Sequence, residues 1–118
     1  MPLDSANWPA VEVDETTALL IRARGYLERG WCRDAVARDA EGNNLVYARS
    51  DKAAAWCMFG ALRAAGMTGD FHHPAFVRLT EVLDAGMSIS SFNDAQENVE
   101  PVLAAFDRAI AAEAPDAA

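Results

Sequence analysis

The sequence predicts a mostly α-helical protein, a compact bundle of about four helices with a small β-hairpin or an irregular loop after the first helix. Three observations predict this class: apolar residues recur at three- and four-residue spacing, helix-starting and helix-ending residues flank those segments, and one turn-rich stretch interrupts them. A chain of 118 residues fits one domain. We expect an N-terminal arm over 1–13, a single helical domain over 14–112 and a frayed tail over 113–118.

The first helix is expected to begin after Asp14 and to end at Gly30. Aspartate is a good N-cap, because its carboxylate accepts hydrogen bonds from first-turn amides, and glycine commonly ends helices. The apolar face of this helix consists of Leu19, Leu20, Ala23, Tyr26 and Leu27.

Turn-forming residues follow the first helix. The sequence "EGNN" (41–44) separates two short runs of β-compatible residues, 35–38 and 45–47. A small hairpin and an irregular loop fit residues 33–49 equally well.

Three further helices are expected. Ser50 is placed to cap a helix that Gly66 ends, Pro74 suits the first turn of the next helix, and Asn98 is placed to cap the last one. The stretch "SISSFNDAQE" (88–97) is expected to be a short turn. The apolar faces of the last two helices consist of Phe76, Leu79, Val82 and Leu83, and of Val99, Val102, Leu103, Phe106 and Ile110.

The charge of the chain argues against two classes of partner. With 18 acidic and 10 basic residues, its net charge of −8 repels phosphate backbones and anionic membrane surfaces. The sequence also shows no basic, apolar signal segment and no run of about 18 apolar residues. We expect a soluble cytoplasmic protein that binds no nucleic acid, no membrane and no cofactor, with two free cysteines and no structural disulfide.

Cys57 decides whether the chain resembles an enzyme. In the expected helix, Cys57 shares one side with Gly60, Ala61 and Ala64, and such a row of small residues lets a neighbouring helix approach closely. Cys57 would lie about two turns inside the helix, where the helix dipole no longer favours a thiolate. We therefore expect a buried packing cysteine. Cys32, just beyond the first helix, is expected to be more accessible.

The chain order Cys57, His72 or His73, and Asn93 also matches the nucleophile, base and orienting group of a cysteine hydrolase. A thiol-dependent hydrolase or transferase that uses Cys57 or Cys32 is therefore the alternative to a binding domain. The spacing of the two histidines and two cysteines does not match a zinc site, so no metal is expected. We expect the two histidines to lie in a loop, with one ring capping the next helix.

Asn93 and Asp94 are a polar pair for which two roles are open. Their side chains can accept hydrogen bonds from nearby amides and form an Asx turn, which is the structural role we expect first. Alternatively, they line a cleft between the third and fourth helices that binds a small molecule or a protein. Trp8 in the N-terminal arm is a further residue that could dock onto another chain. The full set of binding candidates is Trp31, Cys32, Trp56, Cys57, Phe92, Asn93 and Asp94.

Three motifs together resemble a known family. "GWC" ends the first helix, "WCMFGAL" lies in the second, and "FND" precedes the closing helix. Over residues 14–112 the chain is similar to a family of small uncharacterised bacterial and phage proteins. The resemblance marks as signature positions Gly30, Trp31, Cys32, Trp56, Cys57, Gly60, Ala61, Leu62, Asn93 and Asp94. Phe92 stands where that pattern has a tryptophan. The family brings no activity, so the resemblance supports a fold and marks positions only.

The sequence thus favours a small helical domain that binds a protein partner or a second copy of itself. The thiol-dependent enzyme is the alternative. A lower-ranked hypothesis, an acidic mimic of nucleic acid, is disfavoured because Asp and Glu are scattered through every segment rather than gathered on one face.

Overall fold

The structure is a computed structural model that describes residues 14–69, 71–84 and 86–112. The arm over 1–13, including Trp8, and the tail over 113–118 lie outside the described residues. Within them the chain forms five helices and three strands. The helices are α1 (Glu15–Arg29), α2 (Met58–Ala65), α3 (Pro74–Glu81), α4 (Ile89–Ala95) and α5 (Glu100–Ala111), and the strands are β2 (Ala37–Asp39), β3 (Asn44–Leu45) and β4 (Ala53–Trp56).

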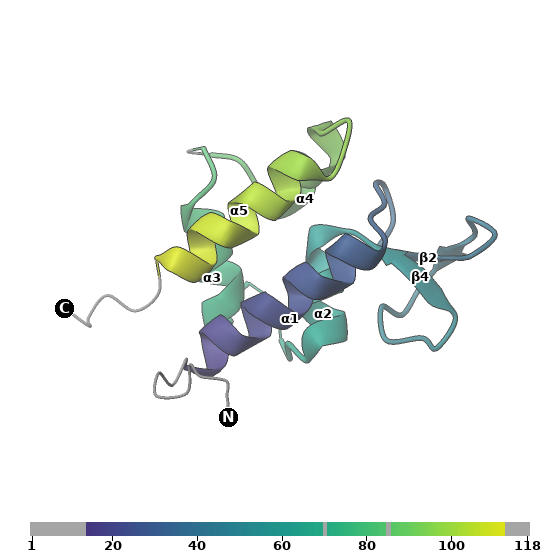
Figure 1. The fold of residues 1–118 in the computed structure, drawn as a ribbon, viewed down its shortest axis with the longest axis horizontal. Helices are drawn as coiled ribbons and strands as arrows, with labels where there is room; N and C mark the ends of the chain where they lie inside the picture. Colours follow the sequence, from purple (N-terminus) through teal and green to yellow (C-terminus); the bar gives the residue numbers. More distant parts are fainter. Residues whose placement is uncertain (1–13, 70, 85, 113–118) are drawn as a thin grey trace, which may run out of the picture.

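The fold is therefore mixed, and the prediction of a four-helix bundle is only partly right. The three strands form an antiparallel sheet in the order β3-β2-β4. Of the two alternatives for residues 33–49, the hairpin therefore forms, and it gains a third strand. This sheet lies at one end of the molecule, past the C-terminal end of α1 (Figure 1). None of the described helices is both long enough and apolar enough to cross a membrane.

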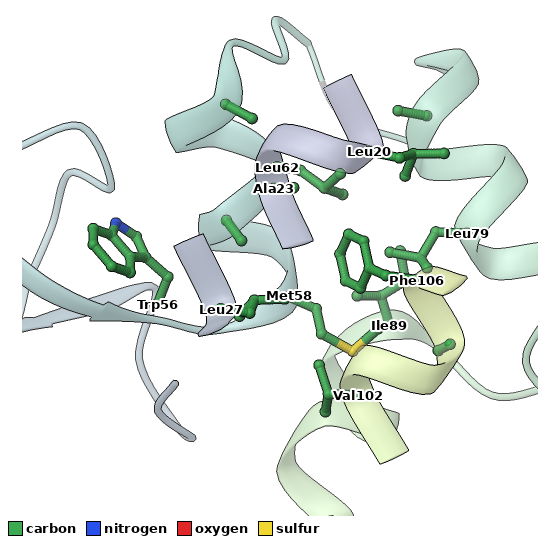
Figure 2. Close-up of a cluster of buried hydrophobic side chains, with 14 of the residues drawn as sticks. Leu20, Ala23, Leu27, Trp56, Met58, Leu62, Leu79, Ile89, Val102 and Phe106 are labelled. Carbon is green, nitrogen blue, oxygen red and sulfur yellow. The ribbon is translucent and has the colours of Figure 1, made fainter. Parts of the chain in front are cut away.

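α1 begins and ends as predicted. The carboxylate of Asp14 accepts a hydrogen bond from the backbone N–H of Thr17 at 2.7 Å, and Gly30 follows the last helical residue. Leu20, Ala23 and Leu27 of this helix are almost fully buried. Their side chains lie in one cluster with residues of every other helix, among them Leu62, Leu79, Ile89, Val102 and Phe106 (Figure 2).

The prediction of a helix that begins after Ser50 is wrong for the first half of that segment. Residues 53–56 form β4, and α2 begins only at Met58, with Cys57 as its N-cap in place of Ser50. Alanine is a strong helix former, so Ala53, Ala54 and Ala55 favour a helix locally. The pairing of β4 with β2 outweighs that preference. Helix propensities differ by only about 0.5 kcal/mol per residue, so tertiary contacts can override them.

Residues 88–97 are not the expected turn. They contain α4, whose first turn is capped by the hydroxyl of Ser88, which accepts a hydrogen bond from the N–H of Ser91 at 3.0 Å. Asn93 and Asp94 lie inside this helix, so the predicted Asx turn does not form. Their side chains bond to segments about 60 residues earlier in the chain, which sequence spacing could not indicate.

The ends of α3 and α5 differ only slightly from expectation. α3 starts at Pro74, and the Nδ1 atom of His73 accepts a hydrogen bond from the N–H of Ala75, which confirms that one histidine ring caps this helix. α5 starts at Glu100, and the side chain of Asn98 accepts a hydrogen bond from the Glu100 N–H at 2.9 Å from just outside the helix. Of the apolar faces that the periodicity predicted, Leu79, Leu83, Val102, Leu103 and Phe106 are buried. The other four residues, Phe76, Val82, Val99 and Ile110, pack partly buried against the core.

Candidate functional site

The two Trp-Cys doublets lie side by side. Trp31 and Trp56 form a parallel β-bridge, in which the N–H of Cys32 donates to the carbonyl of Trp56 at 3.1 Å. The N–H of Trp56 donates in turn to the carbonyl of Gly30 at 3.0 Å. A Cβ atom at Gly30 would lie 2.0 Å from the carbonyl oxygen of Ala54, so only glycine allows this close approach. The two motifs that the sequence singled out are thus joined backbone to backbone.

Asn93 links these two motifs to α4. Its Oδ1 atom accepts hydrogen bonds from the indole Nε1–H of Trp31 at 2.8 Å and from the backbone N–H of Met58 at 3.1 Å. Its Nδ2 atom donates to the carbonyl of Cys32 at 3.1 Å and to the carboxylate of Asp94 at 3.0 Å. The side chain of Asn93 is 1% exposed. A buried amide with four partners of this kind fixes three segments at once.

Asp94 extends this network to the loop after Cys32. Its carboxylate accepts a hydrogen bond from the backbone N–H of Asp34 at 3.0 Å, and Asp34 adopts a left-handed conformation with φ of 63°. Burial by itself raises the pKa of Asp94, but the N–H of Asp34 and the amide of Asn93 outweigh it, so this pKa lies below its ordinary value. We refer to the network of Trp31, Cys32, Asp34, Met58, Asn93 and Asp94 as the Asn93 clasp.

A pocket of about 310 Å³ opens beside the Asn93 clasp. It lies among the loop before β2, the start of α2 and α4, and not between the third and fourth predicted helices. Of the predicted binding candidates, Cys57, Asn93 and Asp94 line it. Its complete lining is Asp34, Ala35, Val36, Cys57, Phe59, Ser90, Asn93 and Asp94.

Cys57 is buried, as predicted, but not at the predicted place. It is the N-cap of α2, where its Sγ atom accepts a hydrogen bond from the N–H of Gly60 at 3.3 Å. A helix N-terminus normally favours a thiolate. Here burial raises the pKa of Cys57 despite the hydrogen bonds from the N–H groups of Gly60 and Phe59, which lower it. The thiol is thus kept protonated by burial and not by distance from the helix end.

Gly60, one of the small residues in α2, has a different partner from the one expected. A Cβ atom at Gly60 would lie 1.9 Å from the carbonyl oxygen of Val36, so Gly60 faces the backbone of the segment entering β2 and not another helix. The same carbonyl of Val36 accepts a hydrogen bond from the N–H of Cys57 at 3.2 Å. Glycine at this position lets the start of α2 and the hairpin meet.

Cys32 is also buried, which corrects the expectation that it is the more accessible thiol. Its Sγ atom lies 3.7 Å from the carbonyl oxygen of Ala35, and its side chain is 7% exposed. Burial, together with the neighbouring Cys57, raises the pKa of Cys32 to about 11. Neither cysteine has the environment of an activated nucleophile.

The structure does not assemble the predicted nucleophile, base and orienting group. His73 uses Nδ1 to cap α3, and neither His72 nor His73 lines the pocket that contains Cys57. Both polar atoms of the Asn93 side chain, Oδ1 and Nδ2, are engaged in the Asn93 clasp. Among the residues described here, no three His, Cys, Asp or Glu side chains gather as a group that could hold a metal ion.

The two remaining binding candidates, Trp56 and Phe92, do not line the pocket at Cys57. The indole of Trp56 is 4% exposed, donates to the carbonyl of Ala48 at 2.9 Å and meets the ring of Tyr26 edge-on, with centroids 4.8 Å apart. Phe92 packs partly buried against the core. The backbone of Trp56 thus pairs with that of Trp31, whereas its side chain is part of the hydrophobic core (Figure 2).

Sequence reasoning missed a second pocket, which we call the hairpin pocket. Its volume is about 430 Å³, and it lies between the segment after β3 and one side of α2. The sequence pattern indicates only that residues 45–47 are a β-compatible run, and nothing in that pattern shows that Val46 and Tyr47 are exposed to solvent. The hairpin pocket is lined by Val36, Val46, Tyr47, Ala48, Arg49, Phe59, Arg63, Met67, Thr68 and Gly69.

Comparison with known proteins places the chain in a family without giving it an activity. No curated protein and no solved structure is significantly similar to it. One family model, described as "Family of unknown function (DUF6197)", matches residues 12–112, which is nearly the range of the resemblance noted from the three motifs. That bacterial and phage proteins share those motifs stays a prediction. Because the match spans most of the sequence, the chain belongs to the DUF6197 family of unknown function.

Proposed function

We propose that this protein is an interaction domain that docks a protein partner at the hairpin pocket. One observation carries the proposal: Val46 and Tyr47, two large apolar side chains at the pocket, are 79% and 74% exposed. Single exposed apolar side chains are ordinary on a protein surface. Neighbouring ones beside a hollow are typical of interaction sites, because their burial by a partner is favourable.

Aromatic side chains extend the apolar surface next to the hairpin pocket. Phe59 lines the pocket and meets the ring of Phe76 edge-on, with centroids 6.3 Å apart. Phe71, which is 66% exposed, meets Phe76 in the same way at 5.4 Å. Aromatic residues are enriched at protein interfaces, where they bury a large area at a small cost in conformational entropy.

The Asn93 clasp supports this function indirectly. It fixes the start of α2 to the loop that leads into β2, and the Val36 carbonyl holds the N–H of Cys57. Val36 and Phe59 line both pockets, the one at Cys57 and the hairpin pocket. The motif residues thus act as a frame that holds the segment before β2 against α2, and the exposed side chains of the segment after β3 make the contact.

The alternative of a thiol-dependent enzyme has less support. Burial raises the pKa of both thiols, and the pocket at Cys57 is lined by no histidine that could act as a base. Among the residues that the structure describes, no arrangement of side chains around either sulfur favours a particular reaction.

Site-specific photo-crosslinking tests the proposal. A photoreactive phenylalanine analogue replaces Tyr47 in cells that make the protein naturally, and the matched control carries it at Ile21, which is 43% exposed on α1. We expect irradiation to give a discrete heavier adduct from position 47 and not from position 21. An adduct of twice the chain mass identifies a second copy as the partner. Equal or absent crosslinking at the two positions would refute docking at the hairpin pocket.

A further inference from the structure

We infer that the hairpin pocket takes an acidic peptide segment, with an apolar side chain in the pocket and carboxylates against Arg49 and Arg63. The inference rests on the proposed docking function and names the chemistry of the partner. Three observations support it: the positive charge of the pocket lining, the fixed positions of the two arginines, and the outer strand β3 beside the pocket.

The hairpin pocket carries positive charge on an acidic protein. The chain has a net charge of −8, yet two of the ten residues that line the pocket are arginines and none is acidic. Among the described residues, the ion pairs to carboxylates are made by Arg24 and Arg78. A carboxylate supplied by a partner would therefore complement a charge that the described part of the chain leaves uncompensated.

Backbone carbonyls hold both guanidinium groups in place. Arg49 donates from Nε to the carbonyl of Arg63 at 2.8 Å and from Nη2 to the carbonyl of Met67 at 3.2 Å. Arg63 donates from Nη1 to the carbonyl of Gly69 at 2.7 Å. Carbonyls orient the two side chains without cancelling their charge. Guanidinium groups held this way lose little conformational entropy when they bind a carboxylate.

The cations lie next to apolar surface. The guanidinium carbon of Arg63 is 5.5 Å from the centroid of the Phe59 ring, and Met67 lines the same pocket. A volume of about 430 Å³ lies in the range of ligand pockets, roughly 300–1,000 Å³. The complementary ligand is therefore amphipathic, with a large apolar side chain flanked by Asp or Glu.

The sheet edge favours an extended peptide. In the order β3-β2-β4, β3 is an outer strand, and Val46 and Tyr47 follow it directly into the pocket lining. An extended segment can add to such an edge through main-chain hydrogen bonds, while the adjacent pocket selects one of its side chains.

A symmetric dimer through the same surface is disfavoured. A twofold contact centred on the hairpin pocket would bring Arg49 and Arg63 of one copy against those of the other, with no acidic residue in the lining to separate them. Like charges brought together in this way oppose association. The acidic segment is therefore assigned to a different protein, and binding to a second copy becomes an outcome that would refute this assignment.

Selection from a phage library of random 12-residue peptides tests the inference. The full chain is the target, and enriched peptides are resynthesised and their Kd measured against wild type, Arg63→Gln, Tyr47→Ser and Arg108→Gln. Arg108 is a matched control, because it is exposed and bonds one carbonyl, that of Val82. We expect acidic peptides with a large apolar residue, an affinity loss of about tenfold in Arg63→Gln and an unchanged affinity in Arg108→Gln. Higher NaCl should weaken binding to wild type, which tests the charge without any substitution.

The outcomes separate this inference from the proposed function. One outcome is that the selected peptides are not acidic, bind Tyr47→Ser more weakly than wild type, and keep their affinity in Arg63→Gln and at high NaCl. This outcome refutes the acidic partner and leaves docking at the hairpin pocket intact. Peptides that bind Tyr47→Ser as well as wild type refute both. The absence of any enriched peptide, or self-association of wild type that Arg63→Gln abolishes, refutes the assignment to an acidic segment of another protein.

Discussion

The indole Nε1–H of Trp31 donates to the side-chain Oδ1 of Asn93 at 2.8 Å, although 62 residues separate the two in the chain. The same oxygen accepts the N–H of Met58, at the start of α2. One buried amide therefore joins the first Trp-Cys motif, the helix that follows the second, and α4. Because the side chain of Asn93 is almost fully buried, its loss would leave the groups that bond to it without a hydrogen-bond partner.

Replacing Asn93 by alanine should destabilise the protein strongly. The change leaves the Trp31 indole N–H, the Met58 N–H and the Cys32 carbonyl without this partner. Unsatisfied buried groups of this kind cost about 1–3 kcal/mol each, and partial relaxation should leave a loss of about 3 kcal/mol. Urea denaturation followed by tryptophan fluorescence measures it. Asn98→Ala is the control, since exposed Asn98 bonds only one amide; equal losses in both variants would contradict the role of the Asn93 clasp.

Two glycine-to-alanine substitutions should change stability in opposite directions. A Cβ at Gly60 would lie 1.9 Å from the Val36 carbonyl oxygen, so Gly60→Ala must push the hairpin away from α2 and should cost about 2 kcal/mol. A Cβ at Gly25 in α1 meets nothing within 4 Å, so Gly25→Ala should gain about 0.5–1 kcal/mol through helix propensity. Thermal melting checks both. An unchanged melting temperature for Gly60→Ala would show that α2 does not pack against the backbone of Val36.

Neither thiol should react quickly in the native protein. With the pKa of Cys32 at about 11, its thiolate is scarce at neutral pH, and burial raises the pKa of Cys57 as well. Ellman's reagent at pH 7.5 should label both sulfurs more slowly than in urea-unfolded protein, by roughly a hundred-fold at Cys32. Fast labelling of one cysteine in the folded chain would revive the hypothesis of a thiol-dependent enzyme.

The raised pKa of Cys32 also predicts a loss of stability in alkali. The ordinary pKa of the thiol is 9.0 and the folded value is about 11, so between these values the unfolded chain loses a proton that the native chain keeps. The free energy of unfolding should therefore be unaffected below pH 9 and fall as the pH rises towards 11. Cys32→Ala should flatten this dependence in urea titrations at several pH values. A decline equally steep in that variant would assign the effect to other groups.

Two substitutions at Asp94 separate a structural role from a ligand-binding one. Asp94→Asn keeps an oxygen that can accept the N–H of Asp34, so its melting temperature should stay near wild type at pH 7, whereas Asp94→Ala should lose about 1 kcal/mol. Because the pKa of Asp94 is lowered, its contribution is present above the unfolded pKa of about 3.9 and is lost as the pH falls through the folded value. A stable Asp94→Asn variant that no longer crosslinks or binds peptide would show that the charge itself contacts a ligand.

Local sequence signals predicted α1 and the cores of α3 and α5 well. Asp14 has the chemistry of an N-cap, and Leu20, Ala23 and Leu27 repeat at helical spacing, so neighbours within one turn determine the element. The burial of Phe106 and Leu79 follows from the same periodicity. The motifs "GWC", "WC" and "ND" could also be recognised as special positions before their partners were known.

Only the tertiary structure decided what those motifs do. The run Ala53–Trp56 has the composition of a helix and becomes β4, because its backbone groups pair with β2 and with Trp31, which are distant in the chain. The contacts of Asn93 and the exposure of Val46 and Tyr47 likewise depend on segments distant in the chain. Sequence periodicity reports which residues avoid water within one element. It carries no information on which distant backbone supplies a hydrogen bond or leaves a side chain uncovered.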